Sequence, residues 1–424
     1  MTLTTPHTDG LQVEGVALAT LAERFGTPCY VYSRAALTAA HAAYRDALAA
    51  HGMRGRSLIC YAVKANSNLA ILDLFARLGA GFDIVSGGEL DRVIKAGGRA
   101  DKVVFSGVGK SRQEMQKALK AGIRCFNVES ASELGQLNEE AGRLGLIAPI
   151  SLRVNPDVDA KTHPYIATGL KSAKFGIDIE QAFDLYLRAA AMPHLAVKGI
   201  DCHIGSQLLD PAPAAEAVGK VLALTDRLAA AGLPLEHIDI GGGIGIQYQA
   251  DEPAPAVADY LAPLLAQFAD RREHLILEPG RSLVGNAGLL LTRVMVLKPG
   301  TDKNFAVVDA AMNDLMRPAL YDAWHDIVPV AAAGKVGPGD TALPWEIVGP
   351  VCESGDFLGH QRKLALHEGD LLAILSAGAY GMAMASNYNS RPRAAEVMID
   401  GGEAHLIRRR ETVGELYALE ACLP

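Results

Sequence analysis

The sequence predicts an α/β protein, in which a TIM (β/α)8 barrel is joined to a second, mainly antiparallel and β-barrel-like β domain. Between about residues 57 and 285, short β-rich runs alternate with segments of helical periodicity. Eight such runs are present, within roughly the 250 residues that a TIM barrel needs. After Gly285 the helical periodicity nearly disappears, while apolar runs separated by Gly, Pro, Asn and Asp continue. Together these observations predict the two-part fold.

The expected barrel strands are the runs at 57–64, 81–85, 102–105, 124–128, 150–155, 197–203, 237–243 and 275–281. Helical segments such as NLAILDLFARLG and GELDRVIKAGG follow nearly all of them. A doubly wound open sheet is the alternative, and its dinucleotide-binding form carries G-x-G-x-x-G in the first βα turn. Here that turn reads KANSN, which favours the barrel.

The β domain is expected from the apolar runs LLLTRVMVL, FAVVD, WEIVGPVC and LLAIL. The first 35 residues contain one strand-like run, CYVYS, which is compatible with either domain. We assign it to the β domain. The predicted boundaries are therefore 36–285 for the barrel, and 1–35 with 286–424 for the β domain.

The composition is that of a soluble globular protein, with 50% hydrophobic and 21% charged residues. A net charge of −8, without a basic stripe, argues against a nucleic-acid partner. The first residues, MTLTTPHTDG, have neither a charged n-region nor an apolar h-region, so we expect no signal peptide, and no apolar run reaches membrane-spanning length. The six scattered cysteines lack a C-x-x-C pair, which favours a reducing, cytoplasmic setting without zinc. We therefore expect no membrane partner and no metal.

Polar residues that can do chemistry lie at the carboxyl ends of the predicted barrel strands, where TIM-barrel active sites are built. Strand alternation would place Lys64 above the small residues Cys60 and Ala62, in the barrel mouth. A strand-end lysine by itself is more often a surface residue that reaches water. The polar residues at these ends are Lys64, Asp83, Arg153, His203 and Glu278.

Glycine turns follow the last two predicted strands, in HIDIGGGIG and EPGR. Such turns let backbone N–H groups approach an anion, and phosphate sites recur after strands 7 and 8 of these barrels. A lone glycine pair often serves only a tight turn, but two successive turns favour a phosphate site. A lysine beside a phosphate site predicts a phosphorylated aldehyde cofactor. Glu278 would then keep a pyridine nitrogen protonated, and His203 would lie against the ring.

Eight motifs resemble the diaminopimelate decarboxylases, a family of the fold-type III pyridoxal-phosphate decarboxylases, which also include eukaryotic ornithine decarboxylase. The match runs from about residue 25 to 415. YAVK and EPGR are shared across the superfamily, whereas CESGD, MRPALY and HIGSQ are more specific. The motifs are YAVKAN (61–66), SAKFGI (172–177), HIGSQ (203–207), GGG (241–243), EPGR (278–281), MRPALY (316–321), CESGD (352–356) and SAGAYG (376–381).

The resemblance implies a pyridoxal 5'-phosphate cofactor, held by Lys64 as a Schiff base. It further implies that His203 stacks on the ring, Glu278 pairs with the pyridine nitrogen, and Cys352 donates a proton to the carbanion left by CO2. The implied cofactor-binding residues also include Ser206, Gly241, Gly242, Gly243, Pro279, Gly280, Arg281 and Tyr380. The implied substrate-binding residues are Arg281, Arg317, Tyr321, Glu353 and Tyr380. Arg153 and Asp83 keep two interpretations, ring-side support or structural ion pairing.

The implied reaction converts meso-2,6-diaminopimelate to L-lysine and CO2, the last step of lysine biosynthesis. The distal end of this substrate carries a carboxylate and an ammonium, which two arginines and Glu353 match. Decarboxylation of ornithine, arginine or carboxynorspermidine is the first alternative. Ornithine has no distal carboxylate, so Arg317 separates it from diaminopimelate. A non-catalytic relative and a barrel enzyme without pyridoxal are further alternatives. The resemblance also implies a head-to-tail homodimer with shared active sites.

Overall fold

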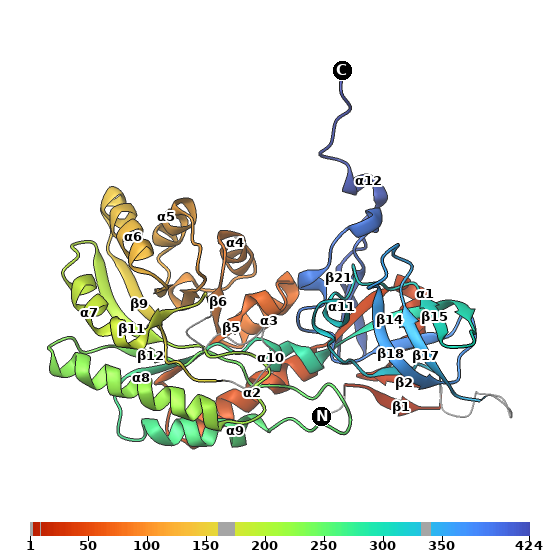
Figure 1. Ribbon diagram of the computed structural model, residues 1–424, viewed down its shortest axis with the longest axis horizontal. Coiled ribbons are helices and arrows are strands. Elements are labelled where there is room, and N and C mark those ends of the chain that lie inside the picture. Colours follow the sequence, from red (N-terminus) through yellow and green to blue (C-terminus); the bar gives the residue numbers. More distant parts are fainter. Residues whose placement is uncertain (1–2, 9, 160–173, 332–340) are drawn as a thin grey trace. The chain divides into compact units, whose positions relative to one another are not determined.

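The computed structural model describes residues 3–8, 10–159, 174–331 and 341–424. The chain divides into two compact units. One comprises Ala40–Ile246 and Ala254–Leu283, and the other comprises Met1–Ala39, Gln247–Pro253 and Val284–Pro424 (Figure 1). The domain boundaries inferred from the sequence, 36–285 for the barrel and 1–35 with 286–424 for the β domain, stay a proposal.

The first unit is a closed barrel of eight parallel strands, as predicted. Its hydrogen-bonded order is β9-β11-β12-β13-β5-β6-β7-β8, and pairing of β8 with β9 closes the barrel. The two-residue strand β10 (Ile177–Asp178) adds to β9. The barrel strands are β5 (Ser57–Ala62), β6 (Gly81–Ile84), β7 (Val103–Phe105), β8 (Cys125–Val128), β9 (Ala148–Asn155), β11 (Leu195–Asp201), β12 (His237–Asp239) and β13 (His274–Leu277).

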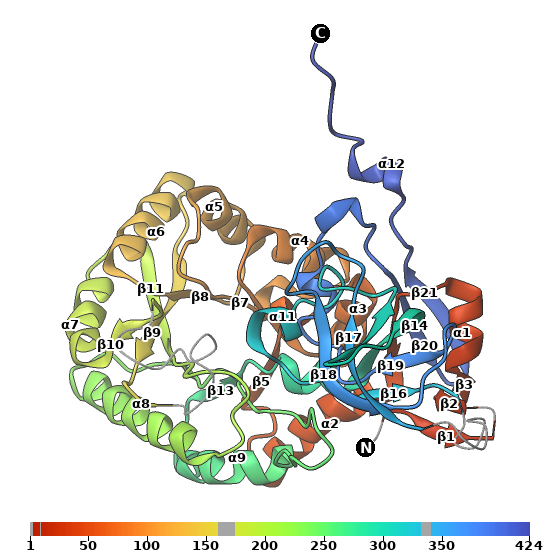
Figure 2. The same cartoon turned by 45° about the vertical axis from the view of Figure 1, so that its right-hand side comes forward.

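Helices form a ring around these strands (Figure 2). Ser86, Ser111 and Ser130 cap three of them, each accepting a hydrogen bond from the backbone N–H three residues later. Serine caps after strands therefore end the loops and start the helices. The helices are α2 (Arg34–Ala50), α3 (Leu69–Arg77), α4 (Gly87–Lys95), α5 (Arg112–Ala121), α6 (Ala131–Leu144), α7 (Ile179–Ala190), α8 (Ala212–Ala230), α9 (Val257–Leu265), α10 (Arg281–Val284), and the 3-10 turns η1 (Val63–Ala65), η2 (Ala100–Lys102), η3 (Ala266–Phe268) and η4 (Gly285–Ala287).

Small side chains fill part of the barrel interior. Cys60, Val104, Cys125 and Ile276 form one buried cluster. Burial raises the pKa of Cys125 to about 12, so this thiol stays protonated at neutral pH. These cysteines therefore act as small buried residues rather than as nucleophiles or metal ligands.

The second unit is mainly antiparallel, as predicted. Its sheet has the order β18-β17-β15-β14-β4-β20-β21. The long strand β14 (Gly288–Lys298) pairs antiparallel with β4 (Cys29–Ser33), β15 (Asn304–Val308) and β19 (Leu371–Ile374). Two pairs, β15–β17 and β4–β20, are parallel. Its other elements are β1 (Thr5–His7), β2 (Gly10–Val13), β3 (Val16–Ala17), α1 (Leu18–Phe25), α11 (Arg317–Tyr321), β16 (Ile327–Pro329), β17 (Leu343–Val348), β18 (Phe357–Leu364), η5 (Met382–Met384), η6 (Tyr388–Ser390), β20 (Ala395–Asp400), β21 (Glu403–Arg408) and α12 (Val413–Leu416).

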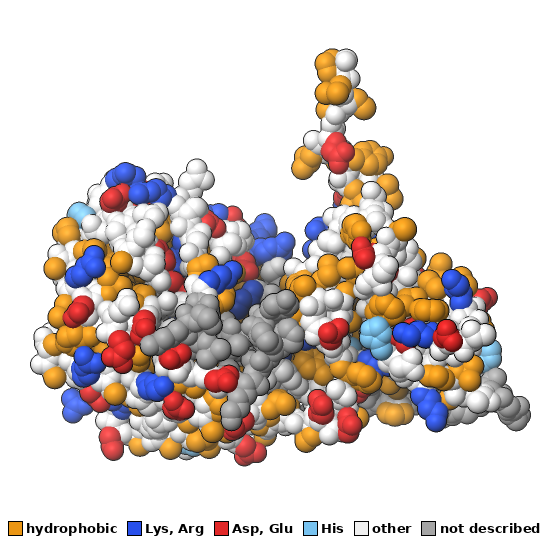
Figure 3. Space-filling view, in the orientation of Figure 1, with side chains coloured by type: hydrophobic (Ala, Val, Ile, Leu, Met, Phe, Trp, Pro, Cys, Tyr) orange, Lys and Arg blue, Asp and Glu red, His pale blue; other side chains and the backbone are white. Residues whose placement is uncertain are grey.

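Two features of the structure bear on possible partners, the charges on its surface and the character of its helices. Acidic and basic side chains are interspersed on the face of the barrel unit seen in Figure 3. Among the described residues, no helix has both the length and the apolar character needed to cross a membrane.

Candidate active site

Lys64 and Asp83 form an ion pair at the carboxyl ends of β5 and β6. Strand β5 ends at Ala62, so Lys64 lies in the 3-10 turn η1 and not in the strand that we predicted through residue 64. Strand alternation therefore does not set the direction of the lysine. The Asp83 carboxylate does so, because its Oδ2 accepts a hydrogen bond from Nζ at 2.7 Å. Asp83 is completely buried, whereas the lysine side chain is 37% exposed.

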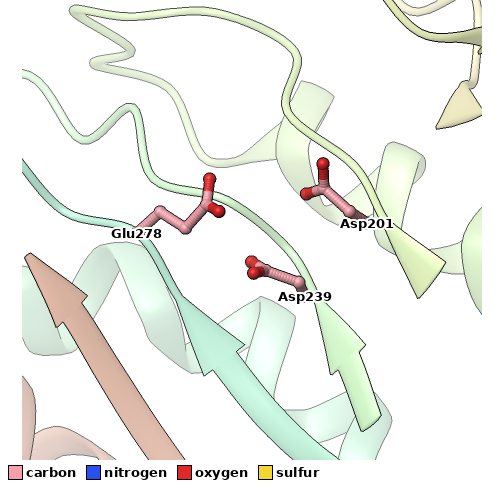
Figure 4. Close-up of side chains that lie close together, drawn as sticks. All are labelled: Asp201, Asp239 and Glu278. Atoms are coloured by element: carbon pink, nitrogen blue, oxygen red, sulfur yellow. The ribbon is translucent and has the colours of Figure 1, made fainter. Parts of the chain in front are cut away.

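Three buried acids face one another at the ends of β11, β12 and β13 (Figure 4). Asp201 and Asp239 are register partners on adjacent strands, and Glu278 follows the third. Their carboxylate oxygens lie within 4.8 Å of one another. Burial, followed by repulsion between these acids, raises the pKa of Glu278 well above its usual range. A further cation placed beside the group would therefore stabilise its charged form.

The sequence prediction included Glu278 but missed the two aspartates. Their common position was visible in the sequence, because the predicted strands GIDCH and HIDIG both carry an Ile-Asp pair near the carboxyl end. Asn127 also contacts Glu278, donating from Nδ2 to Oε1 at 3.3 Å, as does the Ser106 hydroxyl at 3.4 Å. These neutral donors orient the carboxyl group without neutralising it.

Arg153 forms ion pairs with two acids of the barrel. Its Nη1 lies 3.1 Å from Oε1 of Glu129, and its Nε lies 3.9 Å from Oδ2 of Asp201. Its guanidinium also lies 5.0 Å from the ring centre of Phe175. Phe175 belongs to the SAKFGI motif, of which residues 172 and 173 lie outside the described residues.

His203 is a neutral imidazole beside the glycine turn. Its Nδ1 accepts a hydrogen bond from the Gly242 N–H at 3.2 Å, so the ring proton is on Nε2. Burial, with repulsion from the cations Arg153 and Lys64, lowers the pKa of His203 well below its usual range. An uncharged, oriented ring is therefore present at neutral pH.

The GGG turn brings two backbone segments into contact that no larger residue would allow. A Cβ on Gly242 would lie 2.2 Å from the carbonyl oxygen of Glu278. On Gly243 it would lie 2.4 Å from the carbonyl oxygen of Gly205, and on Gly241 2.6 Å from Nδ1 of His203. Gly241 and Gly243 also have φ values of +66° and +104°. Without side chains, the three glycines therefore let these backbone segments approach one another closely.

The EPGR turn also depends on a glycine that lets neighbouring segments approach closely. A Cβ on Gly280 would lie 3.0 Å from the Cβ of Ala62, and the carbonyl of Pro279 accepts the Ala62 N–H at 3.0 Å. Arg281 is buried, and its Nη2 donates to the Ser206 hydroxyl at 3.0 Å. The predicted anion ligands Ser206 and Arg281 are therefore in contact.

These residues fit the expected cofactor. Oδ1 of Asp83 and Oδ1 of Asp201 are buried without a hydrogen-bond partner among the described residues. A protonated ring nitrogen supplies the positive charge that this acidic group needs, and a phosphate suits the glycine backbone beside Arg281 and Ser206. The three acids at the strand ends are also, among the described residues, the one set of donor atoms close enough to hold a metal ion.

The other predicted residues belong to the second unit. Arg317 and Tyr321 are the first and last residues of α11, and Arg317 is buried. Cys352 and Glu353 are exposed in the turn before β18. Tyr380 is half-buried and has a φ of +57°, a conformation that side chains rarely adopt and that often marks a functional position.

The turn that carries Cys352 is fixed by Asp356, the last residue of the CESGD motif, to which the sequence prediction gave no role of its own. Asp356 is buried, and its Oδ1 and Oδ2 accept the N–H groups of Met312 at 2.6 Å and Val351 at 2.8 Å. The Cys352 N–H donates to Oδ1 of Asn389 at 3.0 Å. The exposed thiol is therefore presented from a backbone that is anchored on both sides.

The chain is similar to known proteins over nearly its whole length. A family model described as the pyridoxal binding domain of pyridoxal-dependent decarboxylases matches residues 34–285. The chain is 59% identical to diaminopimelate decarboxylase of Pseudomonas fluorescens, over 98% of this chain and 97% of that protein. It is 59% identical to the diaminopimelate decarboxylase of Neisseria meningitidis serogroup B, over 97% of each chain.

Solved structures agree with this similarity. The diaminopimelate decarboxylase of M. jannaschii in complex with L-lysine is 39% identical, with a TM-score of 0.93, over 99% of this chain and 98% of that chain. The diaminopimelate decarboxylase of Helicobacter pylori, also in complex with L-lysine, is 43% identical, with a TM-score of 0.89, over 95% and 98% of the two chains.

Proposed function

Because this chain belongs to the diaminopimelate decarboxylase family of pyridoxal-dependent decarboxylases, we propose that it converts meso-2,6-diaminopimelate to L-lysine and CO2 with pyridoxal 5'-phosphate. This is the last step of lysine biosynthesis. The structural observation that carries the proposal is the end of the barrel, where Lys64 pairs with Asp83 and the backbone of Glu278 lies against Gly242 of the glycine turn.

Each part of the cofactor has residues suited to hold it. Lys64 is the amine for its aldehyde, and Asp83 keeps that amine oriented through the 2.7 Å hydrogen bond. Gly241 to Gly243, Pro279 and Gly280, with Ser206, Arg281 and Tyr380, would hold the phosphate. When bound, the cofactor accepts the electron pair that the departing CO2 leaves behind.

The residues beside the ring set its protonation. Glu278 shares the buried space of two other acids, so a cation there is stabilised by several carboxyl groups. Glu278 would therefore hold a proton at the ring nitrogen of the cofactor. His203 is neutral and adds no charge to repel that proton.

The second unit supplies the substrate ligands and the acid. The Sγ of Cys352 would return a proton to the carbon that loses CO2. Arg317 and Tyr321, with Arg281 of the barrel, would bind the distal carboxylate, and Glu353 and Tyr380 would complete the site around the distal ammonium. Two guanidinium groups suit a carboxylate because their planar N–H groups form paired hydrogen bonds.

Decarboxylation of ornithine, arginine or carboxynorspermidine is the alternative activity. Ornithine has no distal carboxylate, and a buried guanidinium facing its distal ammonium would be unfavourable. The buried position of Arg317 therefore supports diaminopimelate.

We also propose that the protein forms a homodimer with shared active sites and that it is located in the cytoplasm. The C-terminal segment supports self-association, because Val413, Tyr417, Leu419 and Leu423 are all more than half exposed. Apolar residues exposed in this way are typical of surfaces that a partner covers. Light scattering should give twice the chain mass, and a Leu419→Ser, Leu423→Ser variant should dissociate more readily; a monomeric wild type would contradict the proposal. The six free cysteines fit a reducing compartment.

Covalent trapping of the cofactor tests the assignment of Lys64. Wild-type protein incubated with pyridoxal phosphate should absorb visible light, and after borohydride reduction the peptide that contains Lys64 should carry the added mass. Lys198→Ala is a matched control, because the Lys198 side chain is also 37% exposed and paired with an acid. Lys64→Ala should lose the trapped adduct and Lys198→Ala should keep it. An adduct on another lysine in the wild type would contradict the assignment.

A further inference from the structure

The buried guanidinium of Arg317 is oriented by two aromatic side chains of its own unit. Its Nη1 lies 2.8 Å from Nε2 of His325, which is completely buried. Its central carbon lies 4.6 Å from the ring centre of Tyr248. The Tyr248 and His325 rings meet edge to face, at 5.2 Å and 81°. The guanidinium is thus supported on one edge by the imidazole and on one face by the phenol ring.

The hydrogen bonds of His325 determine which of its two ring nitrogens carries the hydrogen. Its Nδ1 lies 2.8 Å from the carbonyl oxygen of Leu375, which only accepts, so Nδ1 carries the hydrogen. A guanidinium only donates, so Nε2 must be bare to accept from Arg317. The two contacts together require a neutral imidazole with one defined tautomer.

The backbone of His325 is fixed as well. Its carbonyl oxygen accepts a hydrogen bond from Nη2 of Arg362 at 2.8 Å. The Arg362 guanidinium in turn lies 3.1 Å from the ring centre of Trp324. The imidazole is therefore held from both its backbone and its side chain, so it can orient a neighbouring group.

We propose that His325 is a positioning residue for the substrate, which orients Arg317 toward the distal carboxylate and thereby sets the preference for a substrate that has one. The proposal rests on the proposed role of Arg317 as a ligand of that carboxylate. A carboxylate in the place of His325 would neutralise the guanidinium. A neutral imidazole fixes the direction of the guanidinium without neutralising its positive charge.

Two substitutions separate the two hydrogen bonds of His325. Glutamine at this position can present its amide oxygen near the place of Nε2, and so keeps an acceptor for Arg317. Asparagine can present its NH2 group near the place of Nδ1, and so keeps the donor to Leu375 but loses contact with Arg317. We expect His325→Asn to raise KM for meso-diaminopimelate on the order of 10-fold with kcat little changed, and His325→Gln to stay within about 3-fold.

Three controls make the outcome decisive. His405→Asn changes an exposed histidine of the same unit and should leave KM unchanged. Melting temperatures and cofactor absorbance should match between His325→Gln and His325→Asn, so that a difference in KM does not come from misfolding or loss of cofactor. A purely structural role of His325 would instead change the KM of both variants alike. Equal effects of the two variants on KM, or an effect on kcat alone, would overturn the proposal.

Arg317→Gln distinguishes this proposal from the one on which it rests. If Arg317→Gln raises KM but His325→Asn does not, the positioning role of His325 is wrong and the role of Arg317 stands. If Arg317→Gln leaves KM unchanged, the substrate-binding role of Arg317 is wrong, and the role of His325 falls with it.

Discussion

Replacing Gly242 by alanine should damage the cofactor site through a backbone clash. The added Cβ would lie 2.2 Å from the carbonyl oxygen of Glu278, 2.8 Å from its carbonyl carbon and 3.2 Å from the Cα of Pro279. All three neighbours are backbone atoms, so no side-chain rotation relieves the contact. A normal carbon–oxygen contact is longer, and one of the two segments must therefore move by roughly 1 Å.

Overpacking of this kind costs about 1–3 kcal/mol. For a domain of about 150–250 residues, the size range of the barrel unit, each kcal/mol lowers the melting temperature by roughly 2–4 °C. The displacement also moves the Gly242 N–H away from Nδ1 of His203 and shifts Glu278 itself. We therefore expect a lower melting temperature and an affinity for pyridoxal phosphate at least about 10-fold weaker, measured by absorbance titration.

The matched control is Gly135→Ala in α6, where an added Cβ would meet no atom within 4 Å. Alanine is the better helix former, so this variant should be stabilised by about 0.5–1 kcal/mol and should bind the cofactor normally. The reasoning is refuted if Gly242→Ala binds the cofactor as tightly as wild type and melts at the same temperature.

Three further predictions follow from other parts of the structure. Glu278→Gln should still bind the cofactor but lose about 100-fold or more in kcat, because an amide does not hold the ring proton; an unchanged kcat would contradict this role. Burial lowers the pKa of His237 to about 3, so the unfolded state takes up a proton below pH 6.5 that the folded state does not. The free energy of unfolding should therefore fall as the pH drops below 6.5, and His237 should account for a loss of about 2 kcal/mol at pH 5. Chemical denaturation of His237→Asn should show a free energy of unfolding that depends less steeply on pH. Asp356→Ala should lower kcat, because the two backbone N–H groups that anchor the Cys352 turn lose their acceptor. A crystal structure of the variant should show a displaced turn, and an unmoved turn would argue against this role of Asp356.

The barrel was predictable because its strands and helices are each marked by a pattern in a short stretch of sequence. Each strand is a short β-rich run followed by a helical segment, and all eight predicted runs overlap observed strands. The strand ends were less predictable, because a strand ends where its pairing ends. At β5 the chain turns into η1 at Val63, before the lysine.

The candidate site was predictable where the sequence carries a compact motif. Lys64, the glycine turn and EPGR are such motifs, and the structure brings the predicted Ser206 and Arg281 together. Asp239 was missed because its importance depends on register with Asp201 across two strands. Register is a property of pairing between distant segments, which a single strand does not show.

His325 was missed for a different reason. It follows Arg317 by eight residues, outside any helix or strand of the structure. Its role depends on Leu375 and Tyr248, which are distant in the sequence. Contacts of this kind arise only when the second unit has folded.

The most direct test of the proposed function is to measure the products formed from meso-diaminopimelate by purified protein loaded with pyridoxal phosphate. We predict one L-lysine and one CO2 for each substrate consumed, no comparable turnover of ornithine or arginine, and no turnover by Lys64→Ala. Turnover of ornithine without lysine release from meso-diaminopimelate would contradict the proposed function.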